Sequence, residues 1–218
     1  MLKIDGLVAG QGGRRLARLP SLTLAAGESG LLLGPSGSGK TTLLLAIAGL
    51  ADILAGSVRI GDAEIPALSL AARDRFRGNH VGLIFQDMHL IAGLSTLDNV
   101  LLAPFAIGAG QDRARALALL DQLGLAHRAH RPAETLSRGE AQRAAIARAM
   151  LLKPRVILAD EPTASLDDES CERVAGLLAQ AAGESGAALV IATHDLRLRR
   201  RFEITVRAEP LVEGTPHE

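Results

Sequence analysis

The sequence predicts an α/β protein whose mixed, mainly parallel sheet carries a phosphate-binding site at one edge. The apolar run Leu31–Leu33 leads into a glycine-rich loop, and a helical stretch follows from Thr42. Two further apolar runs, Val156–Ala159 and Ala188–Ala192, are separated by a stretch with the pattern of one helix. Strands that alternate with helices pair in parallel, and such sheets bind ligands at the carboxyl ends of their strands.

The glycine-rich loop fits the spacing of a glycine, four residues, a glycine, a lysine and a hydroxyl residue. Its candidate nucleotide-binding residues are Gly34, Pro35, Ser36, Gly37, Ser38, Gly39, Lys40, Thr41 and Thr42. Glycines let the backbone point several N–H groups at a polyphosphate, and the start of the next helix adds partial positive charge. We expect Lys40 to contact the β- and γ-phosphates and the Thr41 hydroxyl to bind Mg²⁺. Kinases, GTPases, motors and transporters share this loop, so it does not by itself indicate how the nucleotide is used.

Length and charge narrow the possibilities. A chain of 218 residues is long enough for one α/β core with a subdomain. Its 24 basic and 24 acidic residues balance, which gives no electrostatic reason to expect nucleic acid as the main partner. A targeting segment is not evident, and the apolar runs are shorter than the ~20 residues that span a bilayer. We therefore expect a cytoplasmic protein that reaches a membrane through a partner.

The first third of the chain is expected to form strands. Residues 2–33 combine short apolar segments with glycine-bearing turns, a mixture that favours strands over helices. Val58–Ile60, followed by the turn residues Gly61 and Asp62, predicts another strand, and Val81–Phe85 predicts a more buried one.

A helical insertion is expected next, over about residues 87–153. Alanine and leucine recur with helical spacing in Asp112–Leu123 and in Glu140–Leu152. The α/β pattern then resumes, with a helix over about Ser170–Ala182. The single cysteine, Cys171, excludes an internal disulfide framework, and its charged neighbours predict a place on the surface of that helix.

Two adjacent carboxylates, Asp160 and Glu161, follow the strand Val156–Ala159. Neighbouring residues of a strand point to opposite sides, so the two carboxylates can have different roles. Beside a phosphate loop, we expect Asp160 to belong to the Mg²⁺ shell and Glu161 to polarise the attacking water. The simpler interpretation is a strand that ends in a polar turn at Pro162.

Ser137 and Glu140 are spaced as a capping box at the start of a helix. This pattern can be purely structural. A helix start with a serine and a glycine can also bind an anion such as a γ-phosphate. The residues alone leave both interpretations open.

Taken together, these motifs resemble the ordered motif set of the ATP-binding-cassette ATPases. The motifs are, in chain order, Gly34–Thr42, Gln86, Leu136–Glu140, Val156–Glu161, Ala164–Asp167 and His194. The resemblance covers about residues 2–206 and implies a P-loop NTPase fold: a RecA-like core, an N-terminal antiparallel β subdomain and an inserted helical subdomain. The whole chain, 1–218, would be a single cassette, with 1–86 and 154–218 as the core and β subdomain and about 87–153 as the helical subdomain.

The resemblance also implies roles for individual residues. Gln86 would sense Mg²⁺ and couple the site to a membrane partner, and His194 would contact the γ-phosphate. Asp167 would link the two sites of a dimer. The signature residues Ser137, Arg138, Gly139 and Glu140 would contact ATP bound to the opposite subunit. ATP and Mg²⁺ are the implied ligands, and a second cassette and an integral membrane permease are the implied partners.

Three departures from the family pattern qualify these expectations. Arg138 stands where glycine is common and either adds a cation near the phosphates or faces solvent. Glu140, like the segments Phe85–Leu90 and Leu94–Val100, resembles the lipoprotein-releasing, macrolide-exporter and cell-division branch. The first β segment has no aromatic residue to stack on adenine, so weaker base discrimination is expected unless Arg14 or Arg15 substitutes.

Two surface features have a functional and a simpler interpretation. Met88, Leu90 and Ile91 are expected to form a groove for the membrane subunit, although packing within the helical subdomain would also explain them. The cluster formed by Arg197, Arg199, Arg200 and Arg201 is expected to be a solvated helix end.

The expected function is an ATP-hydrolysing subunit that dimerises over two ATP molecules and drives membrane transport or extraction. It would lie at the cytoplasmic face of the inner membrane, with export or lipoprotein release favoured. The alternatives are a cell-envelope or cell-division regulator without transport, a soluble cassette ATPase acting on ribosomes or DNA, and a phosphotransferase.

Overall fold

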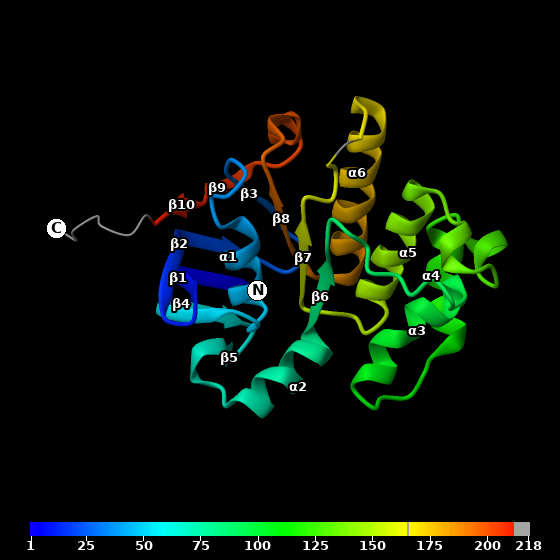
Figure 1. Cartoon of the computed structure of the whole chain (residues 1–218), viewed down its shortest axis with the longest axis horizontal. Coiled ribbons are helices and arrows are strands. Elements are labelled where there is room, and N and C mark those ends of the chain that lie inside the picture. Colours follow the sequence, from blue (N-terminus) through cyan, green and yellow to red (C-terminus); the bar gives the residue numbers. More distant parts are fainter. Residues whose placement is uncertain (165, 212–218) are drawn as a thin grey trace.

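Figure 1 shows the fold of the chain in a computed structural model, which describes residues 1–164 and 166–211. The described strands form two five-stranded sheets. The antiparallel sheet has the order β10-β2-β1-β4-β5, formed by Glu209–Pro210, Arg14–Leu24, Leu2–Gln11, Asp52–Ile60 and Ala63–Glu64. The parallel sheet has the order β6-β7-β8-β3-β9, formed by Val81–Ile84, Val156–Asp160, Ala188–Thr193, Ser29–Leu33 and Ile204–Arg207. The expected parallel and antiparallel pairing is thus divided between two sheets.

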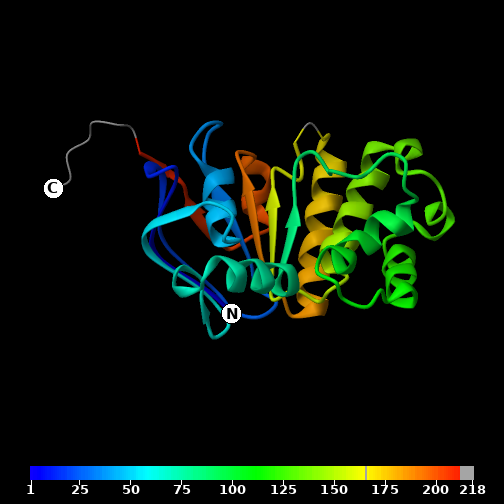
Figure 2. The same ribbon diagram turned by 60° about the horizontal axis from the view of Figure 1, so that its bottom comes forward.

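Helices cover both faces of the parallel sheet. The α-helices are α1 (Lys40–Ile47), α2 (Leu70–His80), α3 (Thr96–Ala106), α4 (Arg113–Gln122), α5 (Arg138–Met150) and α6 (Asp168–Ser185). Short 3-10 turns are η1 (Ile65–Ala67), η2 (Ala126–Arg128), η3 (Ala133–Thr135) and η4 (Leu196–Arg200). Figure 1 shows α1 beside the antiparallel sheet, with α3, α4, α5 and α6 on the opposite side of the parallel sheet, and Figure 2 shows the same division from a second direction.

The alternation of side chains along the parallel strands divides the core into two clusters. In β3, Leu31 and Leu33 join the cluster beneath α3 to α6, whereas Leu32 joins the cluster around α1 and the antiparallel sheet. β8 alternates in the same way, with Ile191 in the first cluster and Val190 in the second. A parallel strand buried on both faces needs apolar residues at every position, which explains the continuous apolar runs in the sequence.

The order of the parallel strands brings the predicted motifs to one edge. β3, β6, β7 and β8 are parallel neighbours, so their carboxyl ends point the same way. These ends lead into the glycine-rich loop, Gln86, the Asp160–Glu161 pair and His194. Four segments far apart in the sequence therefore converge on one side of the sheet.

Two expectations from the sequence need correction. Cys171 was expected on a helix surface, but it is fully buried within α6. It belongs to the inward-facing stripe with Val174, Ala175 and Leu178, which lie one and two turns further on. The second correction is α2, which the sequence did not indicate because none of its residues is buried. No described helix combines the length and hydrophobicity that a membrane crossing requires.

Candidate nucleotide-binding site

The glycine-rich loop lies between β3 and α1 and surrounds the buried ammonium group of Lys40. Lys40 Nζ donates to the carbonyls of Gly34, at 2.9 Å, and Pro35, at 3.1 Å. Gly39 has a left-handed φ of 82°, and a side chain there would come within 2.4 Å of Ala17 Cβ in β2. Glycine is therefore required at this position both by the backbone and by the close approach of the hairpin.

Thr41 and Asp160 meet on one side of the loop. The Thr41 hydroxyl donates to Asp160 Oδ2 at 2.6 Å, joining the first turn of α1 to the end of β7. Burial raises the pKa of Asp160, and the hydrogen bond from Thr41 only partly offsets it. Asp160 Oδ1 and Ser38 Oγ are buried without a hydrogen-bond partner. Hydroxyl and carboxylate oxygens with unused acceptor capacity are the donor set that Mg²⁺ prefers, so this corner fits the metal.

Glu161 lies on the other side, between Lys40 and His194. Its Oε1 is 3.1 Å from Lys40 Nζ and 2.9 Å from His194 Nδ1, and its Oε2 accepts from Thr193 Oγ1 at 3.1 Å. Burial favours the protonated form, but the bonds to His194, Lys40 and Thr193 outweigh it and lower the pKa of Glu161. The carboxylate is therefore held ionised and oriented.

These groups share an open cleft of about 440 Å³. Its lining residues are Ser36, Gly37, Gly39, Lys40, Thr41, Thr42, Gln86, Glu161, Ala164 and His194. A second cleft of about 370 Å³ adjoins it, with Glu161, Ala164 and His194 in both walls. The structure thus brings the predicted loop, Gln86, Glu161 and His194 together around one space.

The four predicted signature residues lie apart from the lining of this cleft, at the start of α5. Ser137 Oγ accepts from the Glu140 N–H, and Glu140 Oε2 accepts from the Ser137 N–H at 2.8 Å, which completes the predicted capping box. The Ser137 N–H, followed by the Arg128 side chain, lowers the pKa of Glu140 to about 2. Gly139 is the second residue of the first turn of α5, between Arg138 and Glu140.

Arg138 contacts the segment that follows Glu161, and Asp167 lies at the end of that segment, where α6 begins. The exposed Arg138 side chain donates to the Ala164 carbonyl at 3.0 Å, so it faces solvent and also bonds to its own chain. Asp167 caps α6 and accepts from the N–H and hydroxyl of Ser170, which lowers the pKa of Asp167. Ser165, between them, lies outside the described residues.

A comparison with known protein families identifies the family to which a chain with this site belongs. The family model described as ABC transporter matches residues 18–164, well over half of the chain. This chain belongs to the ABC transporter family. As a member, it is an ATP-binding cassette that hydrolyses ATP, and both the predicted P-loop fold and the predicted activity are confirmed.

Individual relatives of this cassette agree over nearly its whole length. The lipoprotein-releasing system ATP-binding protein LolD 1 of Rhodopirellula baltica is 44% identical over 191 residues, 84% of this chain and 83% of that protein. The uncharacterized ABC transporter ATP-binding protein YbbA of Escherichia coli is 42% identical over 214 residues, 96% of this chain and 92% of that protein. Among solved structures, the dimeric ATP-binding cassette MJ0796 in a post-hydrolysis state with ADP and Pi superposes with a TM-score of 0.80. It is 33% identical and covers 96% of this chain and 94% of that one.

The cassette also contains site residues that the sequence did not reveal. Gln142 in α5 is buried and donates its amide N–H to the Pro162 carbonyl, next to Glu161. Thr193 bonds to Glu161, and Ala17 lies against Gly39. These contacts join distant segments, so no local spacing indicated them. The only available signal was the polar Thr193 at the end of an apolar strand.

The expected arginine cluster is only partly a solvated helix end, and Met88, Leu90 and Ile91 do not line the groove that lies beside them. Arg197 pairs with Asp168 and Asp195, so it is not simply solvated, whereas Arg199 and Arg200 are exposed. Leu90 packs against the larger core cluster, and Ile91 is 51% exposed. A groove of about 340 Å³ does lie nearby, but Phe85 and His89 line it instead of these two residues.

Proposed function

We propose that this cassette powers a membrane complex that releases or exports lipoproteins or other lipophilic molecules. The observation that carries its ATPase role is the Glu161 carboxylate, which is held ionised between Lys40 and His194 at the edge of the cleft. The identity of 44% with a lipoprotein-releasing ATP-binding protein supports the lipoprotein branch.

The contacts of Lys40 suggest how ATP prepares the site. Lys40 Nζ contacts the carbonyls of Gly34 and Pro35 and the carboxylate of Glu161. The β- and γ-phosphates would draw the ammonium group towards themselves and so release one oxygen of Glu161. Glu161, still oriented by Thr193 and His194, could then accept a proton from the attacking water.

The metal site proposed here consists of Thr41, Asp160 and Gln86: Thr41 and Gln86 line the same cleft, and Asp160 accepts a hydrogen bond from Thr41. Mg²⁺ bound there would supply charge neutralisation at the β- and γ-phosphates. His194 would contact the γ-phosphate, and because it also contacts Glu161, this contact would affect the position of the Glu161 carboxylate.

The second half of the site would come from another copy of the chain. Ser137 and its neighbours lie at the start of α5, where the helix dipole gives a partial positive charge. Two chains facing each other would place this helix start over the γ-phosphate of the opposite chain, with Asp167 linking the two sites. The dimeric state of MJ0796 supports this arrangement.

The membrane-spanning part would be supplied by permease subunits at the cytoplasmic face of the inner membrane. Within the cassette, we propose residues 1–86 and 154–218 as the core with its β subdomain and about 87–153 as the helical subdomain. The clustering of α3, α4 and α5 in Figure 1 supports this division for the described part of the chain.

Glu161→Gln tests the catalytic assignment. We expect ATP turnover to fall by at least about a hundredfold, since general-base catalysis contributes about 10²–10⁴. ATP binding should persist, so the variant should form an ATP-dependent dimer in size-exclusion chromatography. Glu203→Gln, a change of an exposed glutamate, is the matched control. Normal steady-state hydrolysis by Glu161→Gln would contradict the role of Glu161.

Purification from detergent-solubilised membranes tests the complex. A multi-spanning partner is expected, and in proteoliposomes the pair should release a lipid-modified protein only when ATP is supplied. Copurifying ribosomal RNA or DNA would instead support the soluble alternative. A partner that responds to ATP without releasing lipid-modified protein would support the regulatory one.

A further inference from the structure

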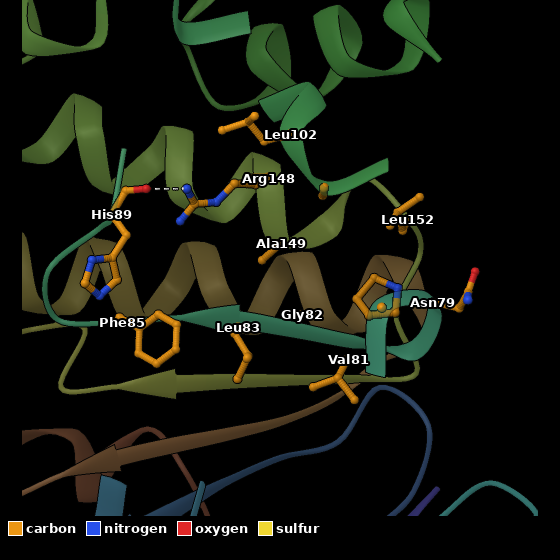
Figure 3. Close-up of a pocket in the computed structure, with 13 residues that line it drawn as sticks. Asn79, Val81, Gly82, Leu83, Phe85, His89, Leu102, Arg148, Ala149 and Leu152 are labelled. Carbon is orange, nitrogen blue, oxygen red and sulfur yellow. Dashed lines mark hydrogen bonds between the residues drawn. The ribbon is translucent and has the colours of Figure 1, made fainter. Parts of the chain in front are cut away.

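The loop that follows β6 separates two cavities. Gln86 lines the nucleotide cleft, whereas Phe85 and His89 line the groove of about 340 Å³ between β6, α3 and the end of α5. Figure 3 shows Phe85, His89 and Arg148 around this groove. A displacement of the loop would therefore change both cavities together.

Arg148 holds this loop from α5. Its Nη1 donates to the His89 carbonyl at 2.7 Å and its Nη2 to the Met88 carbonyl at 2.6 Å. The first of these bonds is the dashed line in Figure 3. A planar guanidinium that donates to two consecutive carbonyls fixes their orientation as well as their distance.

Two further features define the shape of this loop. His89 has a left-handed φ of 47°, which is unfavourable for a residue other than glycine and persists where the surroundings impose it. The rings of Phe85 and His89 meet edge to face, with centroids 5.2 Å apart. Gln86 lies between these two rings in the sequence, two residues after β6, which pairs with the strand that carries Asp160.

We propose that Arg148 is a positioning residue for Gln86, fixing the Met88–His89 backbone and so setting how far Gln86 reaches into the nucleotide cleft. The inference rests on the proposed role of Gln86 at the metal site. It adds a residue of α5 that touches neither nucleotide nor metal but determines the geometry of a group that does.

Arg148→Lys is the primary test, because lysine keeps the charge but cannot span both carbonyls. In the nucleotide-free chain, hydrogen exchange at residues 86–90 should accelerate by about two- to tenfold, as expected for the loss of one hydrogen bond. The Mg²⁺ concentration needed for half-maximal binding of a fluorescent ATP analogue should rise by a similar factor. Binding measured in EDTA should not change.

Arg115→Lys is the matched control. Arg115 on α4 also bonds to two consecutive carbonyls, those of Met150 and Leu151, but these belong to the end of α5. The control should loosen the end of α5 and leave both the exchange at residues 86–90 and the Mg²⁺ requirement unchanged. Equal effects of the two variants would show a general loss of stability and overturn the inference.

Gln86→Ala completes the design. If Arg148 acts through Gln86, Arg148→Lys should add nothing to the Mg²⁺ requirement of Gln86→Ala. If the Mg²⁺ requirement rises in Gln86→Ala but not in Arg148→Lys, the inference about Arg148 is wrong, while the proposed metal role of Gln86 stands. An unchanged requirement in Gln86→Ala would overturn the proposed metal role of Gln86 and the inference with it. Arg148→Gln, read by the same criteria, replaces the lysine variant if that chain does not fold.

Discussion

Glu161 shows how one residue combines an unfavourable backbone with a reactive side chain. Its φ of 45° is left-handed, which costs free energy for any residue except glycine. Thr193, Lys40 and His194 hold its carboxylate, so the surrounding contacts maintain this conformation. The turn directs Glu161 away from Asp160, and the two neighbouring carboxylates therefore face different partners.

Asp160 leads to a prediction about stability. Because burial raises its pKa, its charged form reduces the free energy of unfolding at neutral pH. Asp160→Asn should therefore raise the melting temperature of the metal-free chain at pH 7, by ~2–4 °C for each kcal/mol of relief. The gain should vanish below about pH 4, where the wild-type carboxyl is protonated in the unfolded and folded states.

The same variant should lose Mg²⁺-dependent hydrolysis, so stability and activity should change in opposite directions. Calorimetry in EDTA at pH 7 and about pH 3 provides the measurement. Asp62→Asn, a change in an exposed turn, is the control and should shift stability by less than about 0.5 kcal/mol. A lower melting temperature for Asp160→Asn at pH 7 would contradict the electrostatic argument.

Base selectivity gives a second prediction for single residues. Ala17, the residue of β2 that approaches the phosphate loop, is not aromatic, and all four phenylalanines lie further along the chain. Without a stacking contact of ~1–3 kcal/mol, GTP should compete with ATP within about tenfold. Competition binding would measure this, and a preference for ATP of a hundredfold would contradict it. Reduced ATP affinity in Arg14→Ala or Arg15→Ala would identify an arginine that takes the stacking role.

Among the elements, α5 connects most parts of the site. Its start carries the capping box, Gln142 reaches the segment after Glu161, and Arg148 reaches the loop that contains Gln86. These positions lie on successive turns of one helix, so a rotation of α5 would move all three contacts together. In the proposed dimer, α5 would therefore couple the half-site at its start to the nucleotide cleft of its own chain.

The capping box of α5 gives a prediction about pH. The pKa of Glu140 is lowered to about 2, so its stabilising effect is present above about pH 4.3 and is lost as the pH falls towards 2. Glu140→Gln keeps one acceptor oxygen for the Ser137 N–H but loses both the charge and the second acceptor oxygen opposite Arg128, which should cost ~0.5–1 kcal/mol at pH 7. Urea unfolding between pH 7 and pH 2.5 should show this difference shrinking below pH 4.3. The control is Glu134→Gln, and a gap that stays constant with pH would contradict the assignment.

Element by element, the sequence predicts what local patterns determine. The glycine spacing, the apolar strands and the Ser137–Glu140 spacing each report on a few neighbouring residues, and the structure contains all three features. Helix α2 escaped prediction because it buries no residue and so has no apolar stripe. Cys171 was misplaced because its charged neighbours masked the inward stripe of α6. Arg115 and Arg148 each donate to two consecutive carbonyls of another segment. These contacts depend on the tertiary fold, so no local sequence pattern indicates them.

At the scale of the whole molecule, we propose that the cassette carries two halves of different sites. The loop with Lys40 lies at the carboxyl edge of the parallel sheet, while Ser137 caps α5 outside the lining of that cleft. The proposed dimer would use both halves, each with the opposite half of the partner. The activity should therefore belong to the pair of chains.

Mixing two inactive variants tests this cross-chain site. Lys40→Ala removes the phosphate contact, and Ser137→Arg blocks the signature contact. Mixed dimers would contain one intact site, so an equal mixture should regain up to about a quarter of wild-type hydrolysis although neither variant is active alone. Each variant mixed with wild-type chain serves as the control for exchange of subunits. A mixture that stays inactive while subunits exchange would contradict the cross-chain site.

The position of β3 has a consequence for how the chain is made. Gly30 pairs with Val190 on one side and with Ile204 on the other, so both neighbours of this apolar strand are synthesised long after it. On the ribosome, Leu31–Leu33 emerges before either neighbouring strand exists. Both edges of this strand stay unpaired until β8 has been synthesised. Open apolar edges recruit strands from other chains. The yield of folded cassette should therefore depend on translation speed and on chaperones that shield unfinished chains, more than on the stability of the finished fold.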